Sequence, residues 1–180
     1  RLGAVFTPMN PTYKEGEIEH QLNDAEASVL IAQESLFPLV KAIRHHVPSL
    51  KEVVIVGQRA EADSHLFRDL LRQFSPKHPP QVALTWAEDL VALPYSSGTT
   101  GLPKGVMLTH QNVVSNNIQF ISSGRITDSD TMLIFLPSYH IYGIMLMCGG
   151  LYAGATLVIM EAFDLERSLA LAQEYGVTLY

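Results

Sequence analysis

Short apolar runs alternate with helical stripes along this chain, and that alternation restricts the possible fold more than any other feature. Runs rich in Val, Ile and Leu predict strands, whereas apolar residues three or four positions apart predict helices. The predicted strands cover 2–7, 29–31, 53–56, 90–95, 132–136 and 156–160. The predicted helices cover 15–23, 38–47, 66–74, 109–121 and a segment that Gly154 ends. This order indicates an α/β fold with mostly parallel sheets and flanking helices.

Composition excludes several classes of protein. The 180 residues carry a net charge of -6 without a basic stripe, so we expect no nucleic-acid partner. Cys148 is the single cysteine, which rules out a disulfide framework and suits a cytoplasmic protein. The chain opens on Arg1 and ends on a strand-like run before Tyr180, so we expect a segment excised from a longer protein. A Pro-rich link at 75–80 is the expected subdomain seam.

One run has the length of a membrane span. Ile141 to Met160 is twenty residues without a charged side chain. The alternative is a buried helix that ends at Gly154, followed by a short parallel core strand from Thr156. We favour the alternative and expect no integral membrane span, because no Lys or Arg cluster flanks the run.

A glycine and hydroxyl loop follows the predicted strand at 90–95. It reads Ser96-Ser97-Gly98-Thr99-Thr100-Gly101-Leu102-Pro103-Lys104-Gly105. Its glycines let the backbone approach a ligand closely, and successive N–H groups in such a loop form an anion-binding concavity. Four hydroxyls and the charge of Lys104 add further donors. The set suits a polyphosphate, whose oxygens need many donors at once.

Two other interpretations of this loop are less favourable. A flexible Ser/Gly linker would not lie between an apolar strand and a helix capped by Thr109. A P-loop requires the spacing GxxxxGK followed by Ser or Thr. Here Gly98 and Gly101 are three apart, and Gly105 follows Lys104 where the metal-binding hydroxyl should stand.

The segment from Tyr95 to Gly105 closely resembles the phosphate-loop signature of the adenylate-forming superfamily, which includes acyl-CoA synthetases and 4-coumarate–CoA ligases. The resemblance extends over 1–180 as part of the N-terminal AMP-binding domain. Further similar positions are Gly3-Ala4-Val5, Pro8, Asn10-Pro11, Val106 to His110, Asn112 and Pro137 to Gly143. The form His140-Ile141-Tyr142-Gly143 resembles coumarate ligases and acyl-CoA synthetases more than peptide-synthetase domains.

The resemblance implies an acid–thiol ligase that uses ATP with Mg²⁺ and takes coenzyme A as co-substrate. A fatty or aromatic carboxylate would attack the α-phosphate to form an acyl-adenylate, and the thiol would then displace AMP. The implied ATP contacts are Ser96, Ser97, Gly98, Thr99, Thr100, Gly101 and Lys104, with Thr100 as the metal ligand. The implied acid contacts are His140, Tyr142 and Gly143, and the implied catalytic residues are Lys104 and His140.

The site is incomplete by this comparison. The family's adenine pocket, its ribose-binding Asp and its C-terminal domain with a second catalytic lysine would lie beyond Tyr180, so we expect 1–180 alone to be inactive. Coumarate ligases often carry a coenzyme A-contacting lysine where this chain has Ala162. An adenylating enzyme with another acceptor (a carrier protein, or oxygen as in luciferases) and a non-catalytic nucleotide-binding segment therefore stay open.

Other residues carry simpler expectations. A metal site at His45-His46 is disfavoured, since adjacent helical residues point about 100° apart; a favourable charge at a helix C-terminus suits them better. Asp128-Ser129-Asp130 is expected to form a turn. His20 is expected at the surface, and Cys148 is expected to be a buried thiol. From its residue type alone, a histidine at 140 is better explained as a satisfied core residue, and only the resemblance turns the expectation toward the acid.

Overall fold

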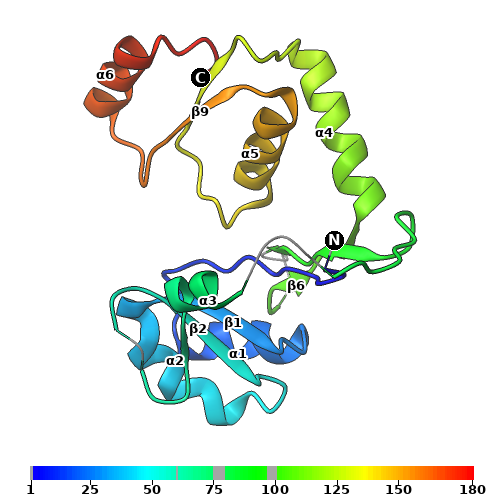
Figure 1. Cartoon of the computed structure of the whole chain (residues 1–180), viewed down its shortest axis with the longest axis vertical. Helices are drawn as coiled ribbons and strands as arrows, with labels where there is room; N and C mark the ends of the chain where they lie inside the picture. The colour runs from blue at the N-terminus through cyan, green and yellow to red at the C-terminus, as the bar shows by residue number, and fades with distance from the viewer. Residues whose placement is uncertain (1, 60, 75–79, 97–100) are drawn as a thin grey trace. The chain divides into compact units, whose positions relative to one another are not determined.

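The computed structural model describes residues 2–59, 61–74, 80–96 and 101–180. The chain divides into two compact units, the first comprising Arg1–Ala83 and Tyr95–Val106, the second Leu84–Pro94 and Met107–Tyr180. Positions 75–79 of the expected seam lie outside the described residues, so that seam stays a prediction. The mixture of parallel sheets and helices confirms the predicted α/β class (Figure 1).

Unit 1 is built on a parallel sheet of order β1-β2-β3. Its elements are α1 (Glu15–Asp24), β1 (Val29–Gln33), η1 (Glu34–Leu36), α2 (Phe37–Ile43), η2 (Arg44–His46), β2 (Glu52–Val56), β3 (His65–Leu66) and α3 (Phe67–Gln73). Pro38 lies in the first turn of α2, as predicted, where its missing N–H leaves no hydrogen bond unmade.

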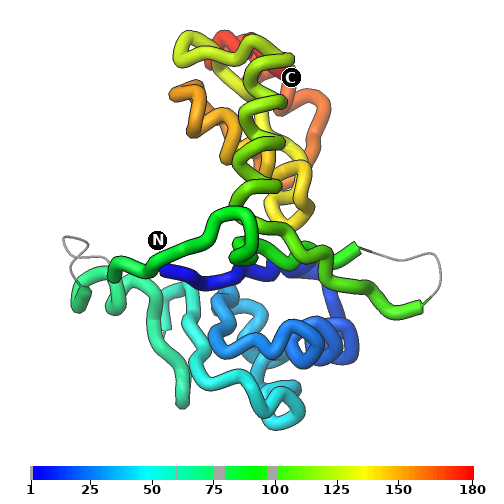
Figure 2. Tube along the Cα trace, turned by 90° about the vertical axis from the view of Figure 1, so that its right-hand side faces the viewer, coloured from blue at the N-terminus to red at the C-terminus, as the bar shows by residue number. Residues whose placement is uncertain are grey.

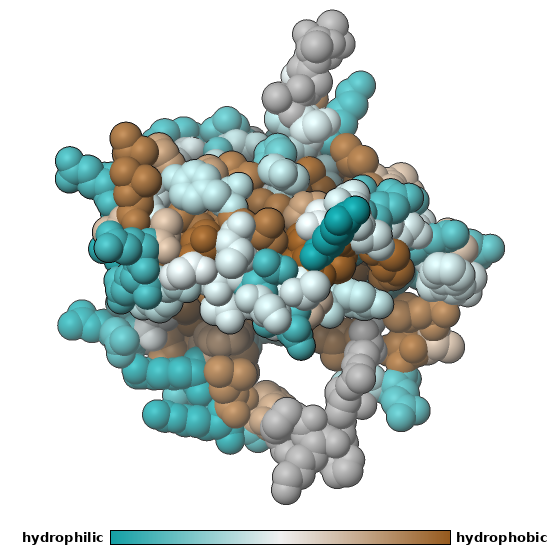
Figure 3. Space-filling model, turned by 90° about the horizontal axis from the view of Figure 1, so that it is seen from above, coloured by the Kyte–Doolittle hydropathy of each residue, from teal (hydrophilic) through white to brown (hydrophobic). Residues whose placement is uncertain are grey.

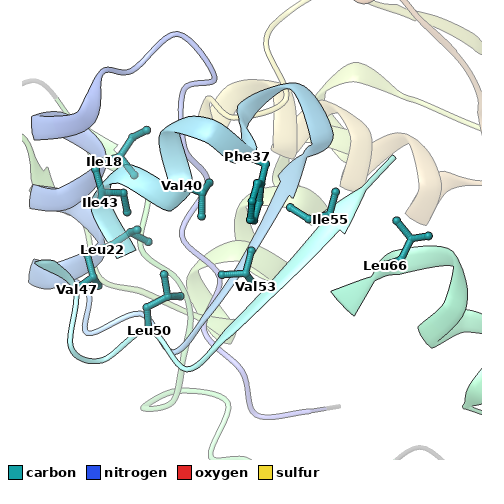
Figure 4. Packing of buried hydrophobic residues seen from close by; sticks show 10 residues of the cluster. All are labelled: Ile18, Leu22, Phe37, Val40, Ile43, Val47, Leu50, Val53, Ile55 and Leu66. Atoms are coloured by element: carbon teal, nitrogen blue, oxygen red, sulfur yellow. The ribbon is translucent and has the colours of Figure 1, made fainter. Parts of the chain in front are cut away.

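The core of unit 1 forms where α1 and α2 pack on β2. Figure 4 shows Leu22 of α1 and Ile43 of α2 near one another, with Val53 and Ile55 on the strand beside them. Each of these four side chains is at most 1% exposed. Burying four such aliphatic side chains contributes roughly 6–12 kcal/mol before the entropy of folding is subtracted.

Unit 1 also contains a short antiparallel hairpin. Its strands are β5 (Tyr95–Ser96) and β6 (Lys104–Gly105), and they pair Tyr95 with Gly105 and Ser96 with Lys104. The predicted strand at 90–95 is therefore wrong as a single element. Its first part is β4 (Leu90–Ala92), which pairs with β7 (Leu108–Thr109) in unit 2, and the chain leaves that pairing at Leu93 and Pro94.

Unit 2 has its own α/β structure, built around the parallel pair β8-β9. Its remaining elements are α4 (His110–Gly124), β8 (Thr131–Ile134), α5 (Ile141–Ala153), β9 (Thr156–Ile159) and α6 (Leu165–Tyr175). Thr109 begins α4 through a reciprocal cap with Asn112, as predicted. The strand-like run before Tyr180 makes one parallel bridge, from Leu179 to Met132.

The uncharged run forms the helix and strand that we favoured over a membrane span. Gly154 ends α5 with φ of 79°, a left-handed conformation that suits glycine. Gly150 lets α5 approach the sheet, because a Cβ there would lie 2.5 Å from Leu157 Cδ2. Across the ranges described here, the structure has no helix both long and apolar enough to cross a membrane.

Three further local expectations about 2–7, β9 and Cys148 were wrong. The segment 2–7 forms no strand beyond one bridging residue, Phe6, and its trace can be followed from the N-terminus in Figure 2. The strand after Gly154 is not fully buried, since Ile159 is 62% exposed. Cys148 is exposed, as are Leu151 and Tyr152, which lie three and four positions later on the same side of α5. Even so, partial burial raises the pKa of its thiol.

Hydrophobic side chains remain visible on the surface of the molecule. Figure 3 shows them among polar residues on one face. In unit 2 the exposed examples include Leu151 and Tyr152 of α5 and Leu169 of α6. Apolar residues are often exposed in folded proteins, so the apolar character of β9 was not enough to predict its burial.

Candidate functional site

The base of the predicted phosphate loop is the β5–β6 hairpin. Ser96 and Lys104 are directly opposed across it, and both are exposed. Opposed residues of an antiparallel pair point to the same face, with Cβ atoms about 4.5–5.5 Å apart. The hydroxyl of Ser96 and the ammonium group of Lys104 therefore leave the same face at the base of the loop, where both can donate to one anion.

Of the remaining predicted loop contacts, the structure describes Gly101 but not the four residues before it. Ser97, Gly98, Thr99 and Thr100 lie outside the described residues, so their assignment stays a prediction. Gly101 has φ of 122°, a conformation that L side chains rarely adopt. The loop thus requires glycine at this position for its backbone path.

Tyr95 attaches the hairpin to α1. Its hydroxyl donates a hydrogen bond of 2.5 Å to Asp24 Oδ2. Its ring also lies against Gly105, where a Cβ would be 3.2 Å from Tyr95 Cε2. Burial, together with the hydrogen bond and the negative charge of Asp24, holds the pKa of Tyr95 well above its usual range. The hydroxyl is therefore a permanent donor at neutral pH.

Sequence reasoning missed two residues that hold this hairpin, Asp24 and His20. His20 is half-buried rather than a surface residue, because its Nε2 contacts the Pro103 carbonyl oxygen at 2.9 Å. The two positions are four apart in α1, which placed them on one helical face. Their contacts depend on a hairpin more than 70 residues later in the chain, so only the fold reveals them.

His140 is the N-cap residue of α5 and is exposed. Its Nδ1 accepts a hydrogen bond of 3.2 Å from the Tyr142 backbone N–H. An acceptor Nδ1 assigns the ring proton of a neutral imidazole to Nε2. His140 is therefore not a core histidine, and its Nε2–H can donate to a carboxylate outside α5.

Gly143 is buried at the start of α5. A Cβ there would lie 2.4 Å from the Pro137 carbonyl oxygen. The same oxygen accepts a hydrogen bond of 3.0 Å from the His140 N–H. Glycine thus allows the first turn of α5 to pack against the turn that positions His140.

A cavity of about 240 Å³ lies in unit 2 beside this segment. Side chains from α4, β8 and α5 line it, among them Phe120, Ile134, Phe135, Leu146 and Tyr142. Tyr142 is 53% exposed, so its phenol contributes both to the wall and to the open surface. His140 is not among the lining residues. The cavity can accept an apolar ring or chain, with polar groups near its edge.

Charged groups outside the two segments include the residue types that a metal centre needs. Within the part of the chain that the structure describes, no three His, Cys, Asp or Glu side chains could hold a metal ion together. His45 and His46 lie in η2, and His46 Nδ1 contacts Glu19 Oε2 at 3.0 Å. Asp130 caps the expected turn by accepting from the Thr127 N–H at 2.8 Å. Thr100, the predicted Mg²⁺ ligand, lies outside the described residues.

The predicted site residues thus belong to two units, and the residues predicted to bind phosphate are in a different unit from those predicted to bind the acid. Ser96, Gly101 and Lys104 are in unit 1, whereas His140, Tyr142 and Gly143 are in unit 2. Unit 1 thus presents an exposed hydroxyl and an exposed ammonium group on one hairpin, and unit 2 contains an apolar cavity close to the segment of His140 and Tyr142.

The chain belongs to the AMP-binding enzyme family, whose model matches residues 1–180. It is 36% identical to 4-coumarate–CoA ligase 5 of Oryza sativa subsp. japonica, over 99% of this chain and 33% of that protein. It is 37% identical to 4-coumarate–CoA ligase of Pinus taeda, over 98% of this chain and 33% of that protein. The chain thus spans about a third of the length of these relatives.

Solved structures support the same family. A long-chain-fatty-acid–CoA ligase from Archaeoglobus fulgidus is 32% identical, with a TM-score of 0.85 over 95% of this chain and 33% of that one. An anthranilate CoA ligase in complex with anthranoyl-AMP is 26% identical, with a TM-score of 0.82 over 94% and 33%. The architecture is that of the N-terminal domain of adenylate-forming ligases, as predicted.

Proposed function

We propose that this chain is the part of an AMP-forming acid–CoA ligase that binds the phosphates of ATP and the carboxylic acid. The observation that carries the proposal is the pairing of Ser96 with Lys104 at the base of a hydroxyl-rich loop. Both side chains are exposed on one face of a very short ribbon, where neither contributes to a core.

The loop suits the first half-reaction. A carboxylate oxygen would form a bond to the α-phosphorus while the bond from that phosphorus to the bridging oxygen breaks. The pyrophosphate that leaves gains negative charge, so donors already aimed at it lower the barrier. The hydroxyls of Ser96, Ser97, Thr99 and Thr100, the N–H groups of Gly98 and Gly101, and the charge of Lys104 would supply these donors. Mg²⁺, with Thr100 as its proposed ligand, would neutralise part of the phosphate charge.

The α5 segment suits the acid. The cavity lined by Tyr142 would take the apolar body of an aromatic acid, or part of a fatty one. The Nε2–H of His140 would hydrogen-bond the carboxylate and help to orient it toward the α-phosphorus. Relatives named for 4-coumarate and for anthranilate support an aromatic substrate, and a relative named for long-chain fatty acids supports a fatty one.

The second half-reaction would transfer the acyl group to coenzyme A, with release of AMP. The names of the relatives as CoA ligases support this acceptor. Because the chain spans about a third of those relatives, we expect 1–180 alone to produce no acyl-adenylate, whereas the whole protein should do so.

The proposed hydrogen bond from His140 to the acid can be tested separately from the role of His140 as an N-cap. In the whole protein, His140→Ala removes both the cap and the donor, whereas His140→Asn retains a favourable N-cap residue and loses the imidazole. We expect both variants to slow adenylation of every acid by about 10–100-fold, the value of a hydrogen bond to a charged group. Acid-dependent pyrophosphate release measures this step.

Thermal unfolding of the same variants is the control. We expect His140→Asn to unfold near the wild-type temperature. In the activity assay, Tyr142→Ala should change the order of preference among acids of different ring content and length. Recovery of the wild-type rate in His140→Asn would show that only the cap matters and would contradict the proposed acid contact.

A further inference from the structure

The stem that carries the phosphate loop is too short to be stable alone. It consists of two residue pairs, Tyr95 with Gly105 and Ser96 with Lys104. An isolated two-stranded hairpin is marginally stable in water even when it is longer. Contacts from outside the hairpin must therefore fix the position of Ser96 and Lys104.

Helix α1 provides such a contact to each arm. Asp24 accepts the 2.5 Å hydrogen bond from the hydroxyl of Tyr95, which begins the first arm. His20 Nε2 lies 2.9 Å from the carbonyl oxygen of Pro103, the residue before Lys104 in the second arm. A carbonyl oxygen only accepts, so His20 is the donor. The rings of His20 and Tyr95 also meet edge to face, with centroids 6.3 Å apart.

These contacts are not needed to attach α1 to the core of unit 1. Ile18 and Leu22 pack into that core, and Gln21 is buried with hydrogen bonds to the Thr7 hydroxyl and the Pro8 carbonyl. Asp24 is the last residue of α1, where the helix dipole disfavours a carboxylate. Its bond to Tyr95 gives a reason for a negative charge at this unfavourable end.

We propose that His20 and Asp24 are positioning residues that hold both arms of the phosphate-loop stem against α1. One carboxylate and one imidazole, a single helical turn apart, determine where Ser96 and Lys104 present their donors. The consequence for catalysis rests on the function proposed above, whereas the attachment of the stem does not.

Limited trypsin digestion of the whole protein tests the attachment without reference to activity. Trypsin cleaves after lysine, so the Lys104–Gly105 bond in β6 reports opening of the stem, and mass spectrometry identifies that product. Asp24→Ala, Tyr95→Phe and His20→Ala should each raise the cleavage rate at Lys104 about tenfold, which corresponds to about 1.4 kcal/mol. The double variant Asp24→Ala with Tyr95→Phe should cleave no faster than either single variant, because both remove one bond.

Two further variants separate this role from general damage to α1. Glu19→Gln alters the same helix but weakens only the contact with His46, and it should cleave at the wild-type rate. Asp24→Asn retains an oxygen that accepts from Tyr95, and it should stay within about threefold of wild type. Tyr95→Phe retains the ring on Gly105, so it remains informative if Asp24→Ala folds poorly.

Steady-state kinetics then test the consequence for the loop. The KM for MgATP should rise about fivefold to tenfold in Asp24→Ala and His20→Ala, while the KM for the acid stays within about twofold. Cleavage rates equal to that of Glu19→Gln would overturn the attachment, and an unchanged KM for MgATP in variants that do open would overturn its consequence for the loop. A wild-type protein inactive with every acid would refute the proposed function instead, and the cleavage rates would still decide the attachment.

Discussion

Replacement of Gly143 by alanine tests the packing at the start of α5. In an open helical position, Gly→Ala stabilises by about 0.5–1 kcal/mol because the unfolded chain loses conformational freedom. At Gly143 the new Cβ would lie 2.4 Å from the Pro137 carbonyl oxygen and 3.0 Å from its carbon. Both are backbone atoms that cannot rotate away, so overpacking should cost about 1–3 kcal/mol. We expect a net loss of about 1–2 kcal/mol in the free energy of unfolding.

Gly16→Ala is the matched control. Gly16 also lies in the first turn of a helix, α1, and its added Cβ would meet no atom within 4 Å. Urea unfolding followed by far-ultraviolet circular dichroism should therefore shift the midpoint down for Gly143→Ala and up for Gly16→Ala, each by about 0.3–1 M. Equal stabilisation of both variants would refute the close approach of α5 to Pro137.

Two other predictions concern single charges. In the whole protein, Lys104→Ala should slow acyl-adenylate formation about 10–100-fold. Transfer of a preformed acyl-adenylate to coenzyme A should stay within about twofold of wild type, because pyrophosphate is absent from the second step. Equal losses in both assays would contradict the proposed role of Lys104. Hydrogen bonds from Thr127 and Thr178 hold the pKa of Asp130 below its ordinary value of 3.8. A lowered pKa gives stability that is present above pH 3.8 and lost as the pH falls through the lowered value. The decrease in urea midpoint between pH 5 and pH 3 should therefore be smaller in Asp130→Asn than in wild type, and an identical decrease would count against this contact.

Elements with strong local signals were predictable. The apolar stripe of α1, the early proline of α2, the capping threonine of α4 and the glycine that ends α5 each act within a few residues, so the sequence carries them directly. The segment 2–7 failed because a short apolar run predicts a strand without specifying a partner strand. The strand predicted at 90–95 divided because its two parts pair with different segments, β7 and β6.

The candidate site, too, could be predicted from the sequence only in part. Sequence alone was enough to predict a phosphate loop with Lys104, because this prediction depends only on the type and order of the side chains, and it stays a prediction. It also placed His140, Tyr142 and Gly143 beyond a strand end. Only the tertiary structure decided that His140 caps α5 through Nδ1, that Gly143 packs on Pro137, and that His20 and Asp24 reach the hairpin. The contacts of His20 and Asp24 join residues that only folding brings together, and the contacts of His140 and Gly143 depend on the backbone path from Pro137 into α5, which neither periodicity nor residue type encodes.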